Sequence, residues 1–236
     1  MTRSLRAVAA FRHSRGVWLV RGLVALALLA GVGFGFIQYQ GNFGVVDPGR
    51  VYRSARPRGG LREWIRAYQL ASILNLCGGS QADAWYASEI QVARELEVAF
   101  YDLPLSAIRR PTRRELLILI DLLGRCRYPL LIHCKSGSDR TGMATALYLL
   151  VGRGEAPDRA IRAFSIGYGH VPFLGPEHLH EPLLEYAEWL KAHRLTHTPD
   201  RFRDWVAHDY RADDPATNIP PLPTGPRARY RPNIMP

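Results

Sequence analysis

The stretch that decides the fold runs from residue 129 to residue 151 and reads PLLIHCKSGSDRTGMATALYLLV. It opens with a continuous apolar run, Pro129 to His133, which predicts a buried strand. It closes with residues 141–151, which are apolar on almost every face and predict a buried helix. Between them lies a short polar loop. A strand, a loop and a helix in this order predict an α/β unit with the loop at the carboxyl end of the strand.

The loop has the residue types that a phosphate group needs. A loop that opens a helix supplies convergent backbone N–H groups and the positive end of the helix dipole. Gly137 lets the backbone turn where a side chain would obstruct it, and the Arg140 guanidinium can bind two phosphate oxygens in a planar fork. His133 is expected to hold the loop backbone. The residues expected to bind or shape the phosphate site are His133, Lys135, Ser136, Gly137, Ser138 and Thr141.

Cys134, which opens the loop, is the predicted nucleophile. A thiol at a helix N-terminus beside Arg140 is expected to exist as the thiolate, which is its nucleophilic form. The thiolate can attack phosphorus and form a phosphocysteine intermediate, and the Thr141 hydroxyl can hydrogen-bond the sulfur when it later leaves. The alternative, a structural cysteine followed by an ordinary surface loop, leaves the coincidence of loop residues and strand–helix flanks unexplained.

The elements before this unit predict the rest of the fold. Residues 71–76 and 98–103 are apolar and predict strands, and residues 82–96 and 112–126 predict helices. Thr112 and Glu115 have the spacing of a capping box at the start of the second helix. We therefore expect an α/β fold with a mainly parallel central sheet flanked by helices.

The residues from His133 to Gly142 resemble the signature of cysteine-dependent protein tyrosine and dual-specificity phosphatases. Residues 49–57, GRVYRSARP, resemble the opening motif of the atypical bacterial, plant and fungal branch. The resemblance covers roughly residues 45–190. It implies the phosphatase fold, catalysis without a metal or other cofactor, Cys134 as nucleophile and Arg140 as phosphate ligand. Rhodanese and arsenate-reductase relatives also use a loop cysteine, but residues 140–142 fit a phosphatase better.

The general acid is not where this family usually has it. The leaving oxygen must be protonated, usually by an Asp, which in dual-specificity phosphatases follows an Ile-Pro-Ile-like segment. Here residues 103–108 read LPLSAI and contain no acid. Two candidates remain. Asp139 has the position of the acid in myotubularin-like phosphatases, and Asp102 precedes the segment. Asp139 is slightly favoured. The alternative role of Asp139 is to orient Arg140, and the alternative role of Asp102 is to hold a turn or a salt bridge.

Charge and composition narrow the possible partners. The formal net charge is +10, but residues 1–46 carry five Arg and no acid, so the rest is only mildly basic and a nucleic-acid partner is not expected. Three cysteines without metal-ligand spacing make a disulfide scaffold or a metal site improbable. We expect Lys135 and the four arginines of residues 109–114 to surround the mouth of the site. These cations favour a phosphorylated protein, an anionic phospholipid or an inositol phosphate as substrate.

The N-terminus predicts a membrane anchor. Residues 1–16 are basic, and residues 17–40 are apolar and long enough to form a transmembrane helix. A cleaved signal peptide and a buried core helix are the alternatives. The basic end favours a non-cytoplasmic, periplasmic catalytic domain. The predicted phosphatase domain covers residues 45–195, followed by a Pro-rich extension, 196–236, that is expected to be poorly ordered at its end. A different class of function, a catalytically weak phosphate-binding module anchored in the membrane, also fits.

Overall fold

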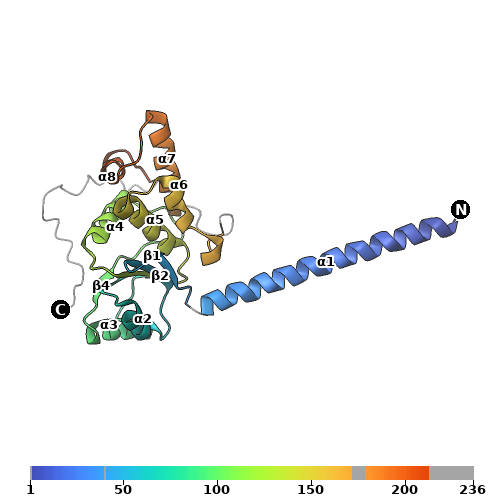
Figure 1. Ribbon diagram of the computed structural model, residues 1–236, viewed down its shortest axis with the longest axis horizontal. Helices are drawn as coiled ribbons and strands as arrows, with labels where there is room; N and C mark the ends of the chain where they lie inside the picture. The colour runs from blue at the N-terminus through green and yellow to red at the C-terminus, as the bar shows by residue number, and fades with distance from the viewer. Residues whose placement is uncertain (1, 40, 172–178, 213–236) are drawn as a thin grey trace. The chain divides into compact units, whose positions relative to one another are not determined.

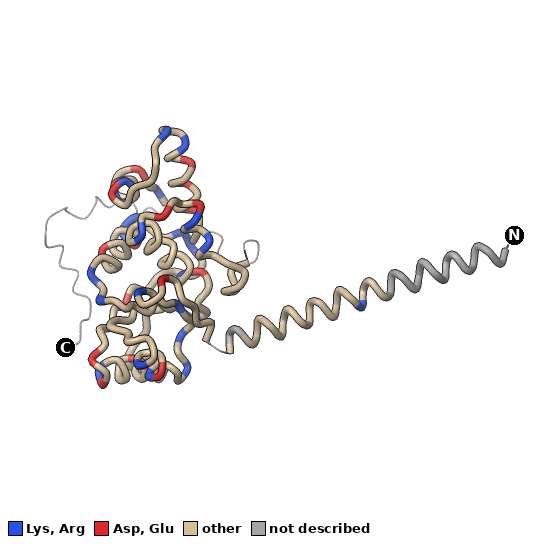
Figure 2. The backbone as a smooth tube through the Cα atoms, in the orientation of Figure 1, with Lys and Arg blue, Asp and Glu red and all other residues tan. Residues whose placement is uncertain are grey.

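The computed structural model describes residues 2–39, 41–171 and 179–212, and the chain divides into two compact units, Met1–Gln40 and Gly41–Pro236. The first unit is the single helix α1 (Thr2–Tyr39) (Figure 1). Its segment Trp18–Phe36 has a mean hydropathy of 2.0 and is long and apolar enough to cross a membrane. Nearly all of the described tube of α1 lacks charge (Figure 2). Length and composition are therefore compatible with the expected transmembrane helix.

The second unit is built on a five-stranded sheet with the order β1-β2-β5-β3-β4. The bounds of its strands are β1 Gly44–Asp47, β2 Val51–Ala55, β3 Ser72–Asn75, β4 Ala99–Asp102 and β5 Leu130–Cys134. All neighbours pair in parallel except the edge strand β1, which is antiparallel to β2. This confirms the mainly parallel sheet. The sequence analysis did not predict β1, which pairs with β2 at the edge of the sheet.

Helices cover both faces of the sheet (Figure 1). Helices α2 (Leu61–Tyr68) and α3 (Ala84–Glu95) pack on one face, where Leu131 of β5 is buried. The other face carries the larger core, to which the neighbouring strand residues Leu130 and Ile132 point. The elements on that face are α4 (Arg113–Arg125), α5 (Asp139–Arg153), α6 (Pro157–Ala160), α7 (Glu181–His193) and α8 (Pro199–His208), with 3-10 turns at Ile161–Ala163 and Ile166–Tyr168.

Two sequence expectations for the central helices are confirmed. The capping box at the start of α4 is present, with the Thr112 hydroxyl accepting from the Glu115 N–H and the Glu115 carboxylate accepting from the Thr112 N–H. Helix α5 is buried along most of its length, including Met143 and Leu147, which have no exposed surface. Because α5 is held on all sides, the loop that precedes it is anchored at its carboxyl end by a rigid element.

The C-terminal part differs from the expectation. The predicted domain ended at residue 195, but α8 follows, and its Phe202, Trp205 and Val206 are buried in the core shared with α4 and α5. The compact unit therefore continues beyond the predicted boundary. The sequence pattern of α8 is short and contains only three core residues, so it did not stand out from the Pro-rich segment. Residues 172–178 lie outside the described part, as do residues 213–236, which form the end of the expected Pro-rich extension.

Candidate active site

The predicted loop lies where three strands end. Cys134 is the last residue of β5, and α5 begins at Asp139. Cys134 pairs in register with Ala55, the last residue of β2, and the preceding His133 pairs with Asn75, the last residue of β3. The carboxyl ends of the three central strands therefore meet around the loop. The Cys134 side chain is almost fully buried, with 1% of its surface exposed.

Gly137 is required in this loop for two reasons. Its φ of +72° lies in the left-handed region that side chains disfavour. A Cβ at this position would also lie 2.5 Å from the Ala55 nitrogen and 2.6 Å from the Ser54 carbonyl carbon, which is too close for any side chain. In this conformation the Gly137 N–H donates to Cys134 Sγ at 3.3 Å. The loop thus directs a backbone donor at the sulfur, as stabilisation of a thiolate requires.

Arg140 is held at the rim of the site by two backbone carbonyls. Its Nη1 donates to the Leu76 oxygen at 3.2 Å and to the Leu105 oxygen at 3.3 Å. Leu76 follows β3 and Leu105 follows β4, so the guanidinium joins the loops after two strands to the start of α5. The side chain is only partly buried. The Nη1 end of the guanidinium is therefore fixed, and Nε and Nη2 make no hydrogen bond to the described residues.

Arg53 is a buried residue of the site whose contacts the sequence did not reveal. Its side chain is 1% exposed, and its Nη2 donates to the Gly137 oxygen at 2.8 Å and to the Ser138 oxygen at 3.2 Å. Its guanidinium also lies 3.8 Å from the centre of the Tyr168 ring. Burial lowers the Arg53 pKa to about 10, so the group stays charged at neutral pH. The one indication of Arg53 in the sequence was its position in the segment 49–57, which resembles the opening motif of the atypical phosphatases.

The two candidate acids have different surroundings. The Asp139 Oδ1 atom is 2.7 Å from His170 Nδ1 and accepts from the Ser138 hydroxyl at 3.2 Å. His170 is 6% exposed and lies after the turn Ile166–Tyr168. The sequence gave no indication of this partner, because 31 residues separate it from Asp139. No hydrogen bond to Asp139 Oδ2 is found in the described part of the chain, so that oxygen remains open.

Asp102 is engaged on both oxygens. Its Oδ1 accepts from Asn75 Nδ2 at 2.7 Å, and its Oδ2 accepts from the Tyr86 hydroxyl. Burial and this hydrogen bond raise the pKa of the Tyr86 phenol, so the phenol remains a donor. These contacts join β4 to β3 and α3. Both Asp102 oxygens are therefore occupied by neighbouring side chains, whereas, among the described residues, one Asp139 oxygen is not.

The residues at either end of the loop are fully buried. His133 has no exposed surface, and its Nε2 is 3.3 Å from an oxygen of the buried Glu89 on α3. The sequence did not single out Glu89, which lies in an otherwise ordinary amphipathic helix. Thr141 is also fully buried, and its hydroxyl has no hydrogen-bond partner among the described residues. That hydroxyl is free to bond a neighbouring sulfur or a bound ligand.

The arginines of residues 109–114 are mostly used in the fold. Arg109 pairs with Glu115, Arg110 pairs with acids on α7, and the buried Arg113 donates to the Ala207 oxygen of α8. These contacts tie the start of α4 to its neighbours and leave little of the expected ring of cations at the mouth. Lys135 remains exposed.

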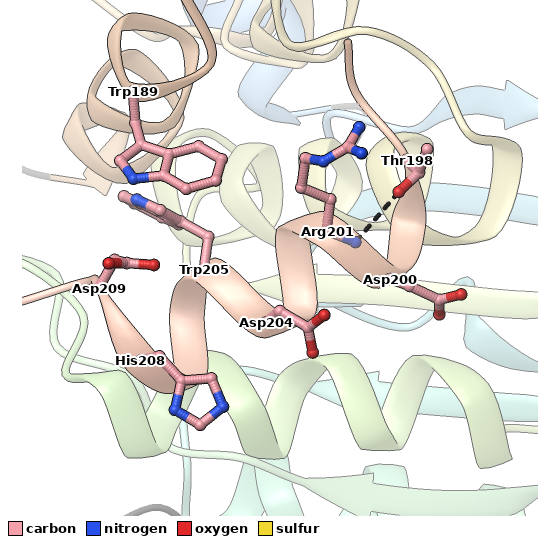
Figure 3. Close-up of a pocket in the computed structure, with 8 residues that line it drawn as sticks. All are labelled: Trp189, Thr198, Asp200, Arg201, Asp204, Trp205, His208 and Asp209. Carbon is pink, nitrogen blue, oxygen red and sulfur yellow. Dashed lines mark hydrogen bonds between the residues drawn. The ribbon is translucent and has the colours of Figure 1, made fainter. Parts of the chain in front are cut away.

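Other features of the described residues are separate from this site. No group of three or more His, Cys, Asp or Glu that could hold a metal occurs among them. A surface hollow between α7 and α8 is lined by none of the residues of the Cys134–Arg140 loop (Figure 3). It is lined by Trp189, Thr198, Asp200, Arg201, Asp204, Trp205, His208 and Asp209.

The fold is that of a known class of enzymes. A mixed five-stranded sheet with a Cys–Arg loop between its central strand and a buried helix is the α/β fold of the tyrosine and dual-specificity phosphatases. The model of the tyrosine phosphatase family matches residues 81–154, which contain the whole loop. This match confirms the resemblance that the loop residues indicated.

This chain is similar to several solved structures, and the first of those named here shows the same fold. A mutant form of Tk-PTP is 24% identical with a TM-score of 0.50, over 64% of this chain and 97% of that chain. TpbA from P. aeruginosa in complex with pTyr is 22% identical with a TM-score of 0.47, over 70% and 96%. The catalytic domain of the PP-IP phosphatase SIW14 from S. cerevisiae is 18% identical with a TM-score of 0.49, over 65% and 93%. Comparison with curated protein sequences finds no match.

Proposed function

We propose that this chain is a cysteine-dependent phosphatase that hydrolyses phosphate monoesters through a phosphocysteine intermediate. The observation that carries the proposal is the arrangement of the loop at the end of β5. The Gly137 N–H is directed at the Cys134 sulfur, and Arg140 is held at the rim by two carbonyls. A thiolate, convergent N–H groups and a fixed guanidinium are what in-line attack on a phosphate requires.

In the first step the Cys134 thiolate attacks phosphorus, the bond from phosphorus to the leaving oxygen breaks, and Asp139 gives a proton to that oxygen. In the second step Asp139 takes a proton from a water that attacks the phosphocysteine. The phosphorus–sulfur bond breaks and inorganic phosphate is released. The Thr141 hydroxyl, which is buried and has no partner among the described residues, stabilises the departing thiolate. Arg140 binds two equatorial oxygens throughout.

The substrates proposed for this site are phosphotyrosine or other phosphoproteins, and polyanionic lipids or inositol phosphates. The exposed Lys135 supports an anionic group beside the phosphate that is cleaved.

We further propose that α1 anchors the domain in a membrane, with the catalytic domain on the non-cytoplasmic side because the first 16 residues are basic. Asn42, which contacts the loop, follows Tyr39 by three residues, so chain length alone keeps their Cα atoms within about 11 Å.

The alternative function is a catalytically weak phosphate-binding module anchored in the membrane. The observation that favours it is the absence of an acid in residues 103–108, where this family usually has one. Hydrolysis of para-nitrophenyl phosphate by the full chain in detergent separates the two functions. We expect phosphate release from the wild type and none from Cys134→Ser. A wild type that binds phosphate but releases none from the ester would favour the binding module.

A further inference from the structure

A phosphate-binding loop imposes a requirement on its own backbone. When successive N–H groups converge on a ligand, the carbonyls of the same residues point away from it, into the protein. Buried carbonyls need donors, because an unpaired one costs free energy. The carbonyls in question belong to Ser136, Gly137 and Ser138. Arg53 donates to those of Gly137 and Ser138, which leaves the carbonyl of Ser136.

The donor to Ser136 is Asn42, from the segment that follows α1. Asn42 is 3% exposed, and its Nδ2 donates to the Ser136 oxygen at 2.8 Å and to the Tyr168 oxygen at 2.9 Å. Both acceptors are backbone carbonyls, which cannot donate. The amide must therefore present its NH₂ group to them, and the reverse orientation would put three oxygens together. Arg53 and Asn42 thus hold three successive carbonyls of the loop.

The backbone around Asn42 is shaped for this contact. Gly41 has a φ of +78° and Asn42 a φ of +47°, so two successive residues adopt the left-handed conformation, which Gly and Asn tolerate best. The Gly41 oxygen accepts from the Ala55 N–H at 2.7 Å, at the end of β2. A Cβ at Gly44 would lie 2.2 Å from the Tyr168 hydroxyl oxygen, so this glycine permits the close packing. The segment 41–44 therefore forms part of the wall behind the loop.

The second acceptor connects Asn42 to the candidate acid. Tyr168 closes the turn Ile166–Tyr168, and its ring lies over the Arg53 guanidinium. Two residues later, His170 contacts Asp139 at 2.7 Å. One amide group therefore joins the loop that binds the phosphate to the segment that orients the acid. Asn42 lies outside residues 81–154, so the part of the chain that matches the family model does not include it.

We propose that Asn42 is a positioning residue of this active site: it holds the catalytic loop in its phosphate-binding conformation from the segment that follows α1. The inference rests on the proposed function, in that the loop binds phosphate. Asn42 lies three residues after the end of α1 in the sequence.

The test compares variants of the full chain in detergent. Asn42→Gly removes the donor and keeps the left-handed backbone, which Asn42→Ala would strain. Asn42→Asp keeps the shape but replaces the NH₂ group by an oxygen that cannot donate. Ser72→Ala is the matched control. Ser72 is also buried and donates to a backbone carbonyl, that of Arg127, but it lies at the start of β3, at the opposite end of the strand from the site.

The affinity for inorganic phosphate is measured by calorimetry. The values of kcat and KM are measured with para-nitrophenyl phosphate, and the thermal midpoint is measured in a separate experiment. We expect Asn42→Gly to bind phosphate about tenfold more weakly, the usual effect of leaving one buried carbonyl of the loop, that of Ser136, without its donor, and Asn42→Asp to lose more. Ser72→Ala should lower the thermal midpoint and keep wild-type phosphate affinity. The inference would be overturned if a folded Asn42→Gly variant kept the wild-type phosphate affinity and kcat/KM. If Asn42→Gly does not fold, the same outcome in Asn42→Asp would overturn it. Phosphate binding needs no turnover, so a wild type that binds phosphate without hydrolysis refutes only the proposed function.

Discussion

Replacing Asp139 by Asn tests the assignment of the general acid. The Asp139 Oδ1 atom is bound by His170 and Ser138, while Oδ2 has no hydrogen bond within the described residues. Asn keeps the size of the side chain but cannot give up a proton to a leaving oxygen. General acid catalysis typically contributes about 10²–10⁴-fold to a rate. We therefore expect Asp139→Asn to slow hydrolysis of an alkyl phosphate by about that factor, which corresponds to about 3–5 kcal/mol of the barrier.

An aryl phosphate provides the internal comparison. The phenolate that leaves para-nitrophenyl phosphate is a good leaving group and needs little protonation, so its rate should fall less than about tenfold. The assay measures kcat and KM for both esters with the full chain in detergent. His170→Asn, which removes the partner of Asp139, should give a smaller loss with the same preference. Such selectivity is not expected from a variant that is only less stable.

Asp102→Asn is the matched control, since Asp102 is the other candidate. Its carboxylate accepts hydrogen bonds from Asn75 and Tyr86, so we expect the substitution to lower the thermal midpoint and to affect both esters equally. Equal losses on the two esters in Asp139→Asn would refute the role of Asp139. Selective loss on the alkyl ester in Asp102→Asn would transfer the role to Asp102.

Three further predictions concern the thiols, the pH dependence of stability and the anchor. At pH 7 iodoacetamide should label Cys134 first, because burial raises the pKa of Cys77 to about 11 and that of Cys126 to about 12. Labelling is measured by peptide mass spectrometry, and preferential labelling of Cys77 would contradict this prediction. Burial lowers the pKa of His197 below its ordinary value of 6.5, so below about pH 6.5 this residue binds a proton in the unfolded chain before it does in the folded one. The free energy of unfolding therefore decreases as the pH falls through this range. His197→Phe should flatten the dependence of the unfolding free energy on pH between 5 and 7, and an unchanged slope would refute the role of this group. A stiff Pro-rich spacer of ten residues between residues 40 and 41 adds about 31 Å. The spacer should slow hydrolysis of a phosphoinositide in vesicles but not that of para-nitrophenyl phosphate. Equal rates on vesicles with and without the spacer would argue against hydrolysis of lipids at the membrane surface.

The sequence alone predicted most of the fold around the site. The apolar run of β5, the buried helix α5 and the capping box of α4 are local patterns, because strand and helix periodicity is written in neighbouring residues. The elements β1 and α8 were not predicted. β1 is an edge strand with a single buried residue, too few for a clear alternation, and α8 is stabilised mainly by the core that it shares with α4 and α5, far along the chain.

The sequence also determined the chemistry of the loop, since Cys134, Gly137 and Arg140 lie within seven residues and their spacing is local. Only the tertiary structure decided what surrounds the loop. Asn42, Arg53 and His170 come from segments between 31 and 94 residues away from their partners. Apart from the place of Arg53 in the segment 49–57, no pattern in the chain relates these residues to the loop. A loop can carry the reactive groups of a site in a short motif. The donors that keep its backbone carbonyls turned away from the ligand must come from whatever the fold brings behind it.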